Sequence, residues 1–570
     1  DAALGAGLLV ETGDARRPLR FTHALVAHAL YSELGARHRR RLHGRAVHVL
    51  RRVDETPRPD TVVELARHSA LTGDLTAAQK WATIAADHAS EHLAPSEAAA
   101  WRERALSYAD QRQVPAADRA ELMLRLGEAQ RRAGDPRASR TLLDAAAIAR
   151  YAGASTVLVE AALANDRGFT TAGKVYEEQL AVLEAALAVT DRTDTTTYAR
   201  LLACRAQELV STPHQSLRLA SAHEAIELVD GSGDPAALPR MISALVFALW
   251  GHDTLDLQRH LTTRAVDLAT KTADPSLEFS AHRARYYVAV ESADVAAARA
   301  SLRRMEEIAV EIGEPRMAWN CAVFAGFEAI MEARFADAEQ ISGRALEIGT
   351  EIGEPAAFML YAGQLFMNRS FAGRYDEVIP ILEQAIATSP ETLPFRLAHA
   401  ISCAVVGREA DARAVLDEGA VAGFGELPLD YLWMTSVVGY AVLAIELLDR
   451  SAAAELYPIL EPFGDQVAFN GATSQGYIGA YLGKLASLLG QHDVADAHLQ
   501  RALDVNVSFS WRYHEATTLI ALAISQRRRT GALDATGQAW LDRAATIAAE
   551  CGSATVADQV TRIRRGDAPL

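Results

Sequence analysis

Apolar residues recur at spacings of three and four along most of the chain, and this periodicity predicts amphipathic helices. Two such helical faces follow Pro315: the first is marked by Met317, Cys321, Phe324 and Glu328, and the second by Ala338, Ile341, Ala345 and Ile348. A helix pair of this length cannot bury its apolar faces alone, so we expect successive pairs to stack on one another.

Proline punctuates these pairs at a regular interval. Acidic residues precede proline at Asp234-Pro235, Asp274-Pro275, Glu314-Pro315 and Glu354-Pro355, so that successive prolines stand 40 residues apart. Proline is favoured in the first turn of a helix, because the N–H that it lacks would have no partner there. An acid just ahead can cap the helix and interact with its dipole. The series therefore predicts helix starts with a period of 40 residues.

A glycine followed by two small residues marks the second helix of several pairs. The marks are Gly73 with Ala78 and Ala85, Gly134 with Ser139 and Ala146, Gly373 with Val378 and Ala385, and Gly490 with Ala495 and Ala502. A turn glycine and small residues two helical turns apart allow close helix–helix approach. Residues 373–378 resemble the Gly-x-Tyr-x-x-Ala turn of the tetratricopeptide repeat. The resemblance covers most of residues 60–550 and implies an all-α fold, an α-solenoid superhelix of helix pairs.

The first 50 residues differ from the repeats that follow. The runs 7–10 and 20–21 bracket a polar turn and are consistent with a short hairpin, and a helical segment follows from Phe21 to His43. This order resembles the end of the winged-helix domain in STAND-type ATPases, especially the LuxR-type large ATP-binding regulators and their cyclase-linked relatives. In that family the segment joins an ATPase module to a tetratricopeptide arm. We therefore expect a winged-helix end and linking helix at 1–52, a repeat array at 53–552 and a polar tail at 553–570.

His23 is the candidate cofactor-binding residue that this resemblance implies. It falls where related nucleotide-switch ATPases carry the histidine of a Met-His-Asp motif, which contacts the phosphates of bound ADP. Thr22 and Ala24 stand here in place of Met and Asp. Taken by itself, His23 is a lone histidine at the start of an amphipathic helix, which favours a structural role.

The formal net charge of −16 argues against nucleic acid as a direct partner, since phosphate binding needs clustered cations. One basic run stands out, made of Arg37, Arg39, Arg40, Arg41 and Arg45. Without interleaved aromatic residues, it indicates a solvated helix face or a contact with an ATPase module. Half of the residues are apolar, as in soluble folded proteins, and no uncharged run is long enough to span a membrane. With no signal peptide, we expect a cytoplasmic protein.

The sequence offers little catalytic chemistry. It contains no Gly-x4-Gly-Lys-Ser/Thr loop, HExxH motif, CxxC pair or Gly-x-Ser-x-Gly elbow. His88 and His92 could share a metal on one helix but have no evident third ligand, so exposed histidines and no metal site are expected. The four cysteines are far apart and are expected to be free thiols. We expect no enzyme activity and no cofactor in this chain; ATP or ADP would belong to an ATPase module outside it.

The segment Trp511-Arg-Tyr-His514 is the densest aromatic and polar cluster. Trp511, Tyr513 and His514 either line a ligand groove on the concave face or form the core of a late helix pair. The chain begins at Asp1 without Met, and we expect it to be a piece of a longer protein.

Two functions remain open at this point. The resemblance implies a bacterial transcriptional regulator's sensing arm, which binds a small inducer or a protein or peptide on its concave face. It would transmit to the ATPase module of the same protein and change its oligomeric state. The alternative is a stand-alone protein-interaction scaffold without a nucleotide switch. A helical enzyme would need a pocket with convergent carboxylates or histidines.

Overall fold

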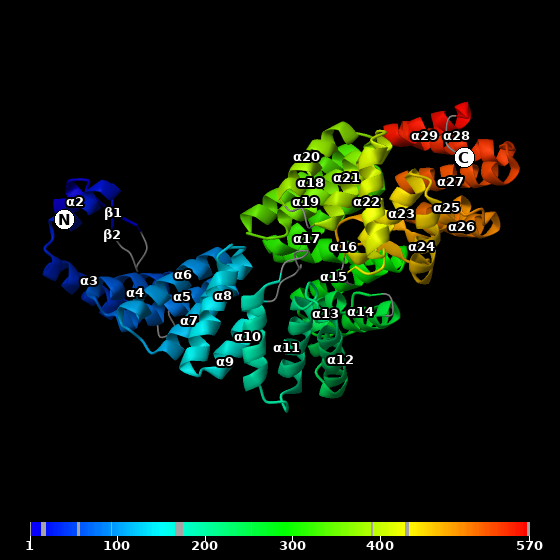
Figure 1. Cartoon of the computed structure of the whole chain (residues 1–570). Coiled ribbons are helices and arrows are strands. Elements are labelled where there is room, and N and C mark those ends of the chain that lie inside the picture. The colour runs from blue at the N-terminus through cyan, green and yellow to red at the C-terminus, as the bar shows by residue number, and fades with distance from the viewer. Residues whose placement is uncertain are drawn as a thin grey trace. The chain divides into compact units, whose positions relative to one another are not determined.

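The computed structural model describes residues 2–12, 19–53, 58–92, 94–165, 175–251, 254–388, 392–427 and 432–566. The chain divides into two compact units, and Figure 1 shows its helices. Unit 1 holds residues 1–133 and 137–157, and unit 2 holds residues 134–136 and 158–570. The array predicted at 53–552 is therefore split between two units, which was not anticipated.

Unit 1 contains a small hairpin followed by helices. Its elements are α1 (Ala2–Gly5), β1 (Leu9–Glu11), β2 (Leu19–Phe21), α2 (Ala24–Glu33), α3 (Ala36–Val53), α4 (Pro59–Thr72), α5 (Leu75–Glu91), α6 (Pro95–Gln111), α7 (Ala116–Ala133) and α8 (Ala138–Ala152). The boundary between the units falls inside α9 (Ser155–Ala164).

The elements described in unit 2 are helices, one hairpin and a short 3₁₀ turn. Its first elements are α10 (Glu177–Val189), α11 (Thr195–Glu208), α12 (Gln215–Ser232), α13 (Ala237–Ala248), α14 (Leu255–Ala269), α15 (Pro275–Glu291), α16 (Val295–Ile312), α17 (Pro315–Met331), α18 (Phe335–Glu351) and α19 (Ala357–Ala372). The rest are α20 (Tyr375–Thr388), α21 (Leu393–Val405), α22 (Glu409–Ala422), α23 (Trp433–Glu446), α24 (Arg450–Leu460), η2 (Glu461–Phe463), β3 (Val467–Phe469), β4 (Ser474–Tyr477), α25 (Ile478–Leu488), α26 (His492–Phe509), α27 (Arg512–Thr530), α28 (Ala535–Cys551) and α29 (Ala554–Arg565).

The predicted fold class is confirmed, because helices pack in adjacent pairs along the chain. The 40-residue period of helix starts is also confirmed. Helices α15 and α17 begin at Pro275 and Pro315, and α13 and α19 begin two residues after Pro235 and Pro355. Asp274 caps α15 as expected, since its carboxylate accepts hydrogen bonds from two backbone N–H groups of the first turn.

The turn glycines lie where the repeat pattern placed them. Gly73, Gly134, Gly373 and Gly490 all have positive φ, at +83°, +71°, +90° and +83°. This left-handed conformation favours glycine because it has no Cβ. Each glycine lies in the turn between the two helices of a pair, just after the first helix ends.

The N-terminal hairpin is confirmed. Strands β1 and β2 pair antiparallel, with Leu9 opposite Phe21 and Val10 opposite Arg20. The polar turn predicted between them lies at 13–18, outside the described residues. Helix α3 continues to Val53, so the predicted boundary at 52 falls in its last turn.

The second hairpin is an insertion that the helical periodicity did not predict. Strands β3 and β4 pair antiparallel, and Phe469 on β3 is buried. Its ring lies 4.9 Å from that of Phe327 and 5.9 Å from that of Tyr287, measured between centroids. The side-chain amide of Gln364 donates to the carbonyl of Ala472 at the tip (3.0 Å). The hairpin thus packs its tip among the side chains of α15, α17 and α19.

The polar tail predicted at 553–570 is wrong for its described part, which is helix α29. Val556, Val560 and Ile563 are buried at spacings of four and three residues, which is a helical stripe of its own. Ser553 caps the helix by accepting from the N–H of Val556. The polar residues between these apolar positions, Asp558, Gln559, Thr561 and Arg562, had hidden the stripe.

Close helix packing gives a test of the fold. A Cβ at Gly483 on α25 would lie 2.5 Å from Cγ of Leu499 on α26. We expect Gly483→Ala to lower stability by about 1–3 kcal/mol through overpacking, seen as a lower melting temperature by calorimetry. Gly343→Ala on α18 is the control, because nothing lies within 4 Å of its Cβ position. It should gain roughly 0.5–1 kcal/mol from helix propensity, and equal behaviour of the two variants would contradict the packing.

Candidate ligand-binding site

The last helix of unit 2 returns to an earlier one. The hydroxyl of Ser553 donates to the carbonyl of Phe371 (2.6 Å), and that of Thr555 donates to the carbonyl of Ser370 (3.1 Å). Gly373 lies so close that a Cβ there would be 2.9 Å from the Thr555 nitrogen. We call this junction of 370–373 with 553–555 the C-terminal seam.

The seam closes a circuit of helices. Helix α19 contacts α20, α20 contacts α21, α21 contacts α23, α23 contacts α25, α25 contacts α27, α27 contacts α29, and α29 contacts α19. We call these seven helices the helical ring. An array that closes in this way has an interior as well as an outer face.

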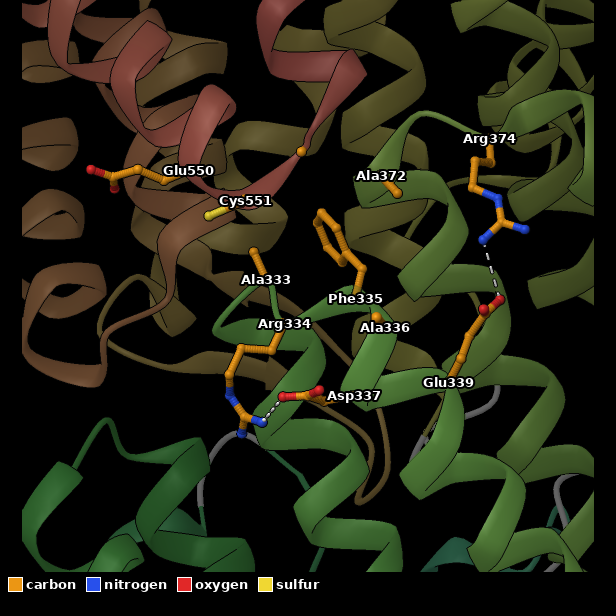
Figure 2. A pocket seen from close by; sticks show the side chains of 11 residues that line it. Ala333, Arg334, Phe335, Ala336, Asp337, Glu339, Ala372, Arg374, Glu550 and Cys551 are labelled. Carbon is orange, nitrogen blue, oxygen red and sulfur yellow. Dashed lines mark hydrogen bonds and ion pairs between the residues drawn. The ribbon is translucent and has the colours of Figure 1, made fainter.

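A hollow of about 560 Å³ opens beside the seam. The turn from 333 to 337, the turn at 372–374 and the end of α28 surround it, as Figure 2 shows. Phe335 is half-buried and lies between Ala336 and Ala372, so part of the lining is apolar. The remaining lining is mostly charged: Arg334, Asp337, Glu339, Arg374 and Glu550.

The arginines of the hollow are paired within the chain. Arg334 pairs with Asp337 (3.0 Å), and Arg374 pairs with Glu339 (3.4 Å), as the dashed lines in Figure 2 mark. Arg374 also holds Glu377 at 2.6 Å and lowers the pKa of that carboxyl. An apolar centre with a polar rim is the usual anatomy of a protein-binding surface.

Cys551 lies in the same hollow, and its thiol is not activated. Burial raises the pKa of Cys551, and the pKa of Cys403 is raised for the same reason. A raised pKa keeps the thiol protonated and weakens it as a nucleophile. All four cysteines are free, as expected. The hollow is therefore suited to binding rather than to thiol chemistry.

The three residues proposed for a groove are packed against aromatic neighbours. Trp511 is fully buried and stacks on Phe509 with 4.3 Å between centroids. Tyr513 is half-buried and stacks on Phe371 at 3.9 Å. His514 is buried, and burial lowers its pKa to about 3. Trp511 and His514 thus lie in the core, while Tyr513 retains exposed surface.

The structure places His23 on the surface of unit 1. It is exposed and stands at the N-cap of α2 with an extended backbone, and its side chain makes no capping hydrogen bond. Of the basic run on α3, Arg39 is half-buried 5.3 Å from the ring centroid of Tyr31, and the other four arginines are exposed. The described contacts of unit 1 leave the proposed nucleotide role of His23 untested.

His88 and His92 do not converge on a common point. The Nδ1 atom of His92 lies 2.7 Å from the backbone oxygen of His88, so it bonds to the main chain. In the described part of the chain, no group of three or more His, Cys, Asp or Glu side chains is arranged to hold a metal. No helix among those residues is both long and apolar enough to cross a bilayer.

A histidine pair that sequence spacing did not indicate joins α3 to α4. Nδ1 of His43 lies 2.7 Å from Nδ1 of His68, and Nε2 of His43 lies 2.9 Å from the Tyr31 hydroxyl. Nε2 of His68 lies 3.3 Å from Glu64. Burial, followed by the charge of Arg67, lowers the pKa of both histidines. The pair connects the N-terminal segment to the first repeat helix.

The comparisons with known proteins give no family. No family model matches the chain, and no curated protein matches it. The crystal structure of the APC/C hetero-tetramer Cut9–Hcn1 is similar at a TM-score of 0.40 and 15% identity, covering 95% of this chain and 99% of that chain. A structure of Naa15/Naa10 bound to HypK-THB has a TM-score of 0.23 and 12% identity, covering 92% and 88%.

A circular tandem repeat protein with novel repeat topology has a TM-score of 0.10 and 15% identity, covering 92% of this chain and 97% of that chain. TM-scores this low carry no inference about function. The reasoning about function therefore rests on the chain's own residues.

The seam can be tested with two glycine variants. Gly373 and Gly490 share a positive φ, so alanine strains both backbones, but only at Gly373 does the new Cβ meet α29. We expect Gly373→Ala to speed hydrogen exchange in residues 553–566 by about tenfold or more, because the overpacked seam opens more often. Gly490→Ala should leave exchange there unchanged. Slow exchange of α29 in both variants would show that the seam does not hold this helix.

The histidine pair predicts a pH dependence for unit 1. Both folded-state pKa values lie below those of the unfolded chain, so the unfolded chain binds more protons as pH falls below about 6.5. Stability is thus present above that pH and is lost below it. We expect His68→Gln to lose less melting temperature than the wild type between pH 7.5 and 5.5, by calorimetry. His48→Gln, an exposed site on α3, should behave as wild type; equal losses in all three proteins would refute the coupling.

Proposed function

We propose that this chain is the effector-sensing repeat arm of a STAND-type, LuxR-like ATPase regulator. In this role it binds a small inducer or a protein and transmits binding to an ATPase module. The observation that carries the proposal is the closure of the repeats through the C-terminal seam, next to an open hollow. A closure of this kind provides two states, one with the seam closed and one with the seam open. An effector that binds one state more tightly stabilises that state.

The energetics of the seam suit such a role. Side-chain hydrogen bonds from Ser553 and Thr555 cross it, and each typically contributes only about 1 kcal/mol. An effector that favours the closed state by a few kcal/mol would therefore change the population of the open state appreciably. An effector with equal affinity for both states would transmit nothing.

The regulator identity is supported by the sequence from Phe21 to His43 and by the order of elements in unit 1. A hairpin and two helices, α2 and α3, precede the first repeat helix α4. That order agrees with the end of a winged-helix domain followed by a repeat arm. The exposed arginines of α3 offer a surface that an ATPase module could contact.

The alternative is a protein-interaction scaffold without a nucleotide switch, and the hollow beside the seam favours it. The half-buried ring of Phe335 within a charged rim fits an apolar anchor from a partner protein. The coding sequence upstream of Asp1 separates the two functions. A phosphate loop followed by a winged helix supports the regulator, and its absence supports the scaffold.

The nucleotide role of His23 can be tested in the full-length regulator. If its imidazole contacts ADP, His23→Ala should speed ADP release about tenfold and raise basal activity, because a charge-assisted hydrogen bond is lost. His28→Ala is the matched control, since His28 is also exposed and lies on the same helix. Release of a fluorescent ADP analogue, measured by stopped flow, reports the effect. Equal release rates in both variants and the wild type would remove His23 from the switch.

A further inference from the structure

The hollow beside the C-terminal seam is bordered by both sides of that seam. Residues 372–374 line it from one side and residues 550–552 from the other, and residues 333–339 complete the lining. Its volume of about 560 Å³ lies within the usual range of binding sites, roughly 300–1,000 Å³. A Cβ at Gly552 would meet nothing within 4 Å, so the space over this backbone is open. A molecule in the hollow can therefore touch both sides of the seam.

The floor of the hollow is apolar. The ring of Phe335 is half-buried and lies between Ala336 and Ala372, as Figure 2 shows. Ala333 is 5% exposed and adds a further apolar side chain to the lining. A partly exposed phenyl ring in a concave surface leaves apolar area in contact with water, and a second apolar side chain would bury that area. The floor thus favours an apolar or aromatic group.

The arginines of the rim are already engaged by carboxylates of the chain. Arg334 lies 2.8 Å from Glu332 and 3.0 Å from Asp337. Arg374 likewise pairs with two carboxylates, at 2.6 Å and 3.4 Å. An anionic ligand would have to displace one of these carboxylates before it could bind a guanidinium group. The rim is therefore poorly suited to an anion.

The charges around the hollow include one carboxylate more than they include guanidinium groups. The lining itself carries three carboxylates and two guanidinium groups. The ion-pair partners of these side chains in the described chain add two of each kind: Glu332, Glu377, Arg369 and Arg512. Asp337 is the most open carboxylate of the lining, with 61% of its side chain exposed, so its oxygens can accept further hydrogen bonds. One positive charge on a ligand would balance the excess.

We propose that the hollow binds a short segment of a partner protein in which an apolar side chain stands beside a lysine or an arginine. The apolar side chain covers Phe335, and the basic side chain pairs with Asp337 at the rim. Because the rim side chains are exposed, from 34% for Glu339 to 61% for Asp337, the hollow is open and a segment can lie across it. An apolar contact inside a polar rim is the usual form of a protein-binding site. The net charge of −16 also favours the approach of a basic partner.

Such a segment is the effector of the proposed sensing arm, and the site rests on that function for its purpose. Bound across residues 372–374 and 550–552, the segment would contact both sides of the C-terminal seam. It would therefore favour the closed seam, because opening the seam separates the two walls of the site. Binding itself is a property of this chain and does not require an ATPase module.

Cys551 allows a direct test on the intact chain, because it is a free thiol in the lining of the hollow. Three peptides are compared: N-acetyl-Phe-Arg-Cys-amide, N-acetyl-Phe-Glu-Cys-amide and N-acetyl-Gly-Arg-Cys-amide. Each is added as its mixed disulfide with β-mercaptoethanol, in excess β-mercaptoethanol, so that thiol–disulfide exchange reaches equilibrium. Burial raises the pKa of Cys551, which slows exchange equally for the three peptides.

Peptide mass spectrometry measures the fraction of each cysteine that carries a peptide. We expect the Phe-Arg peptide to occupy Cys551 at least severalfold more than either of the other two, because it alone combines the apolar and the basic side chain. Cys204 is the internal control, since it is also free and half-buried but lies outside the lining, and it should show no such preference.

A pair of variants on α18 tests the role of the rim. Asp337→Asn should reduce the preference of Cys551 for Phe-Arg over Phe-Glu about threefold, because it removes an exposed carboxylate. Glu347→Gln is the matched control: Glu347 also pairs with the arginine three residues before it, is 65% exposed and lies outside the lining. It should leave the preference unchanged. If Asp337→Asn fails to fold, the order of the three peptides on the wild-type chain decides.

Hydrogen exchange tests the contact with the seam. With the Phe-Arg peptide attached at Cys551, amide exchange in residues 553–566 should be severalfold slower than with the Gly-Arg peptide attached, because the bound segment holds the seam closed. Equal exchange in the two adducts would show that the segment does not bridge the seam.

Three further results overturn the proposal. Equal occupancy of Cys551 by the three peptides would show that the hollow recognises neither side chain, and a preference for Phe-Glu would reverse the sign of the charge. Occupancy that falls as the chain is concentrated, with the peptide in constant excess, would make a second copy of the chain the occupant. Each of these results leaves the regulator proposal standing. The absence of an upstream phosphate loop would instead remove the regulator and leave the docking site standing.

Discussion

Every helix pair of this protein must cover an apolar face that it cannot bury by itself. Inside the array, the neighbouring pair buries this apolar face. Small residues such as Ala78 and Ala502, which are fully buried, allow the two pairs to pack closely. The last described helix buries its apolar face by a contact with a distant helix. Helix α29 meets the same requirement by burying Val556, Val560 and Ile563 and by returning to α19. The ring and its seam both follow from the need to bury the apolar face of each helix.

Closure of the ring changes what the charged residues can do. On outer faces, arginine–carboxylate pairs such as Arg334–Asp337 are exposed to water and contribute little to stability. On α23 and α25, desolvation raises the pKa of Glu446 and lowers the pKa of Lys484, so each shifts toward its neutral form.

The candidate site was only partly predictable. Tyr513 was singled out from the sequence and retains some exposed surface, whereas its neighbours Trp511 and His514 are buried in the core. The hollow around Phe335 gave no local signal, because the residues that line it come from three distant segments, 333–339, 372–374 and 550–552. His43 and His68 were missed for the same reason: their contact depends on how α3 packs on α4.

The sequence by itself determined the helical pairs, their 40-residue period from Pro235 to Pro355, and the turn glycines with positive φ. These features depend on backbone chemistry within a few residues, so local patterns reveal them. Only the tertiary structure decided that α29 closes on α19 and that the β3–β4 hairpin packs its tip among the helices. Long-range packing sets these contacts through the small rotation between successive pairs, which accumulates along the array and leaves no mark at any one position.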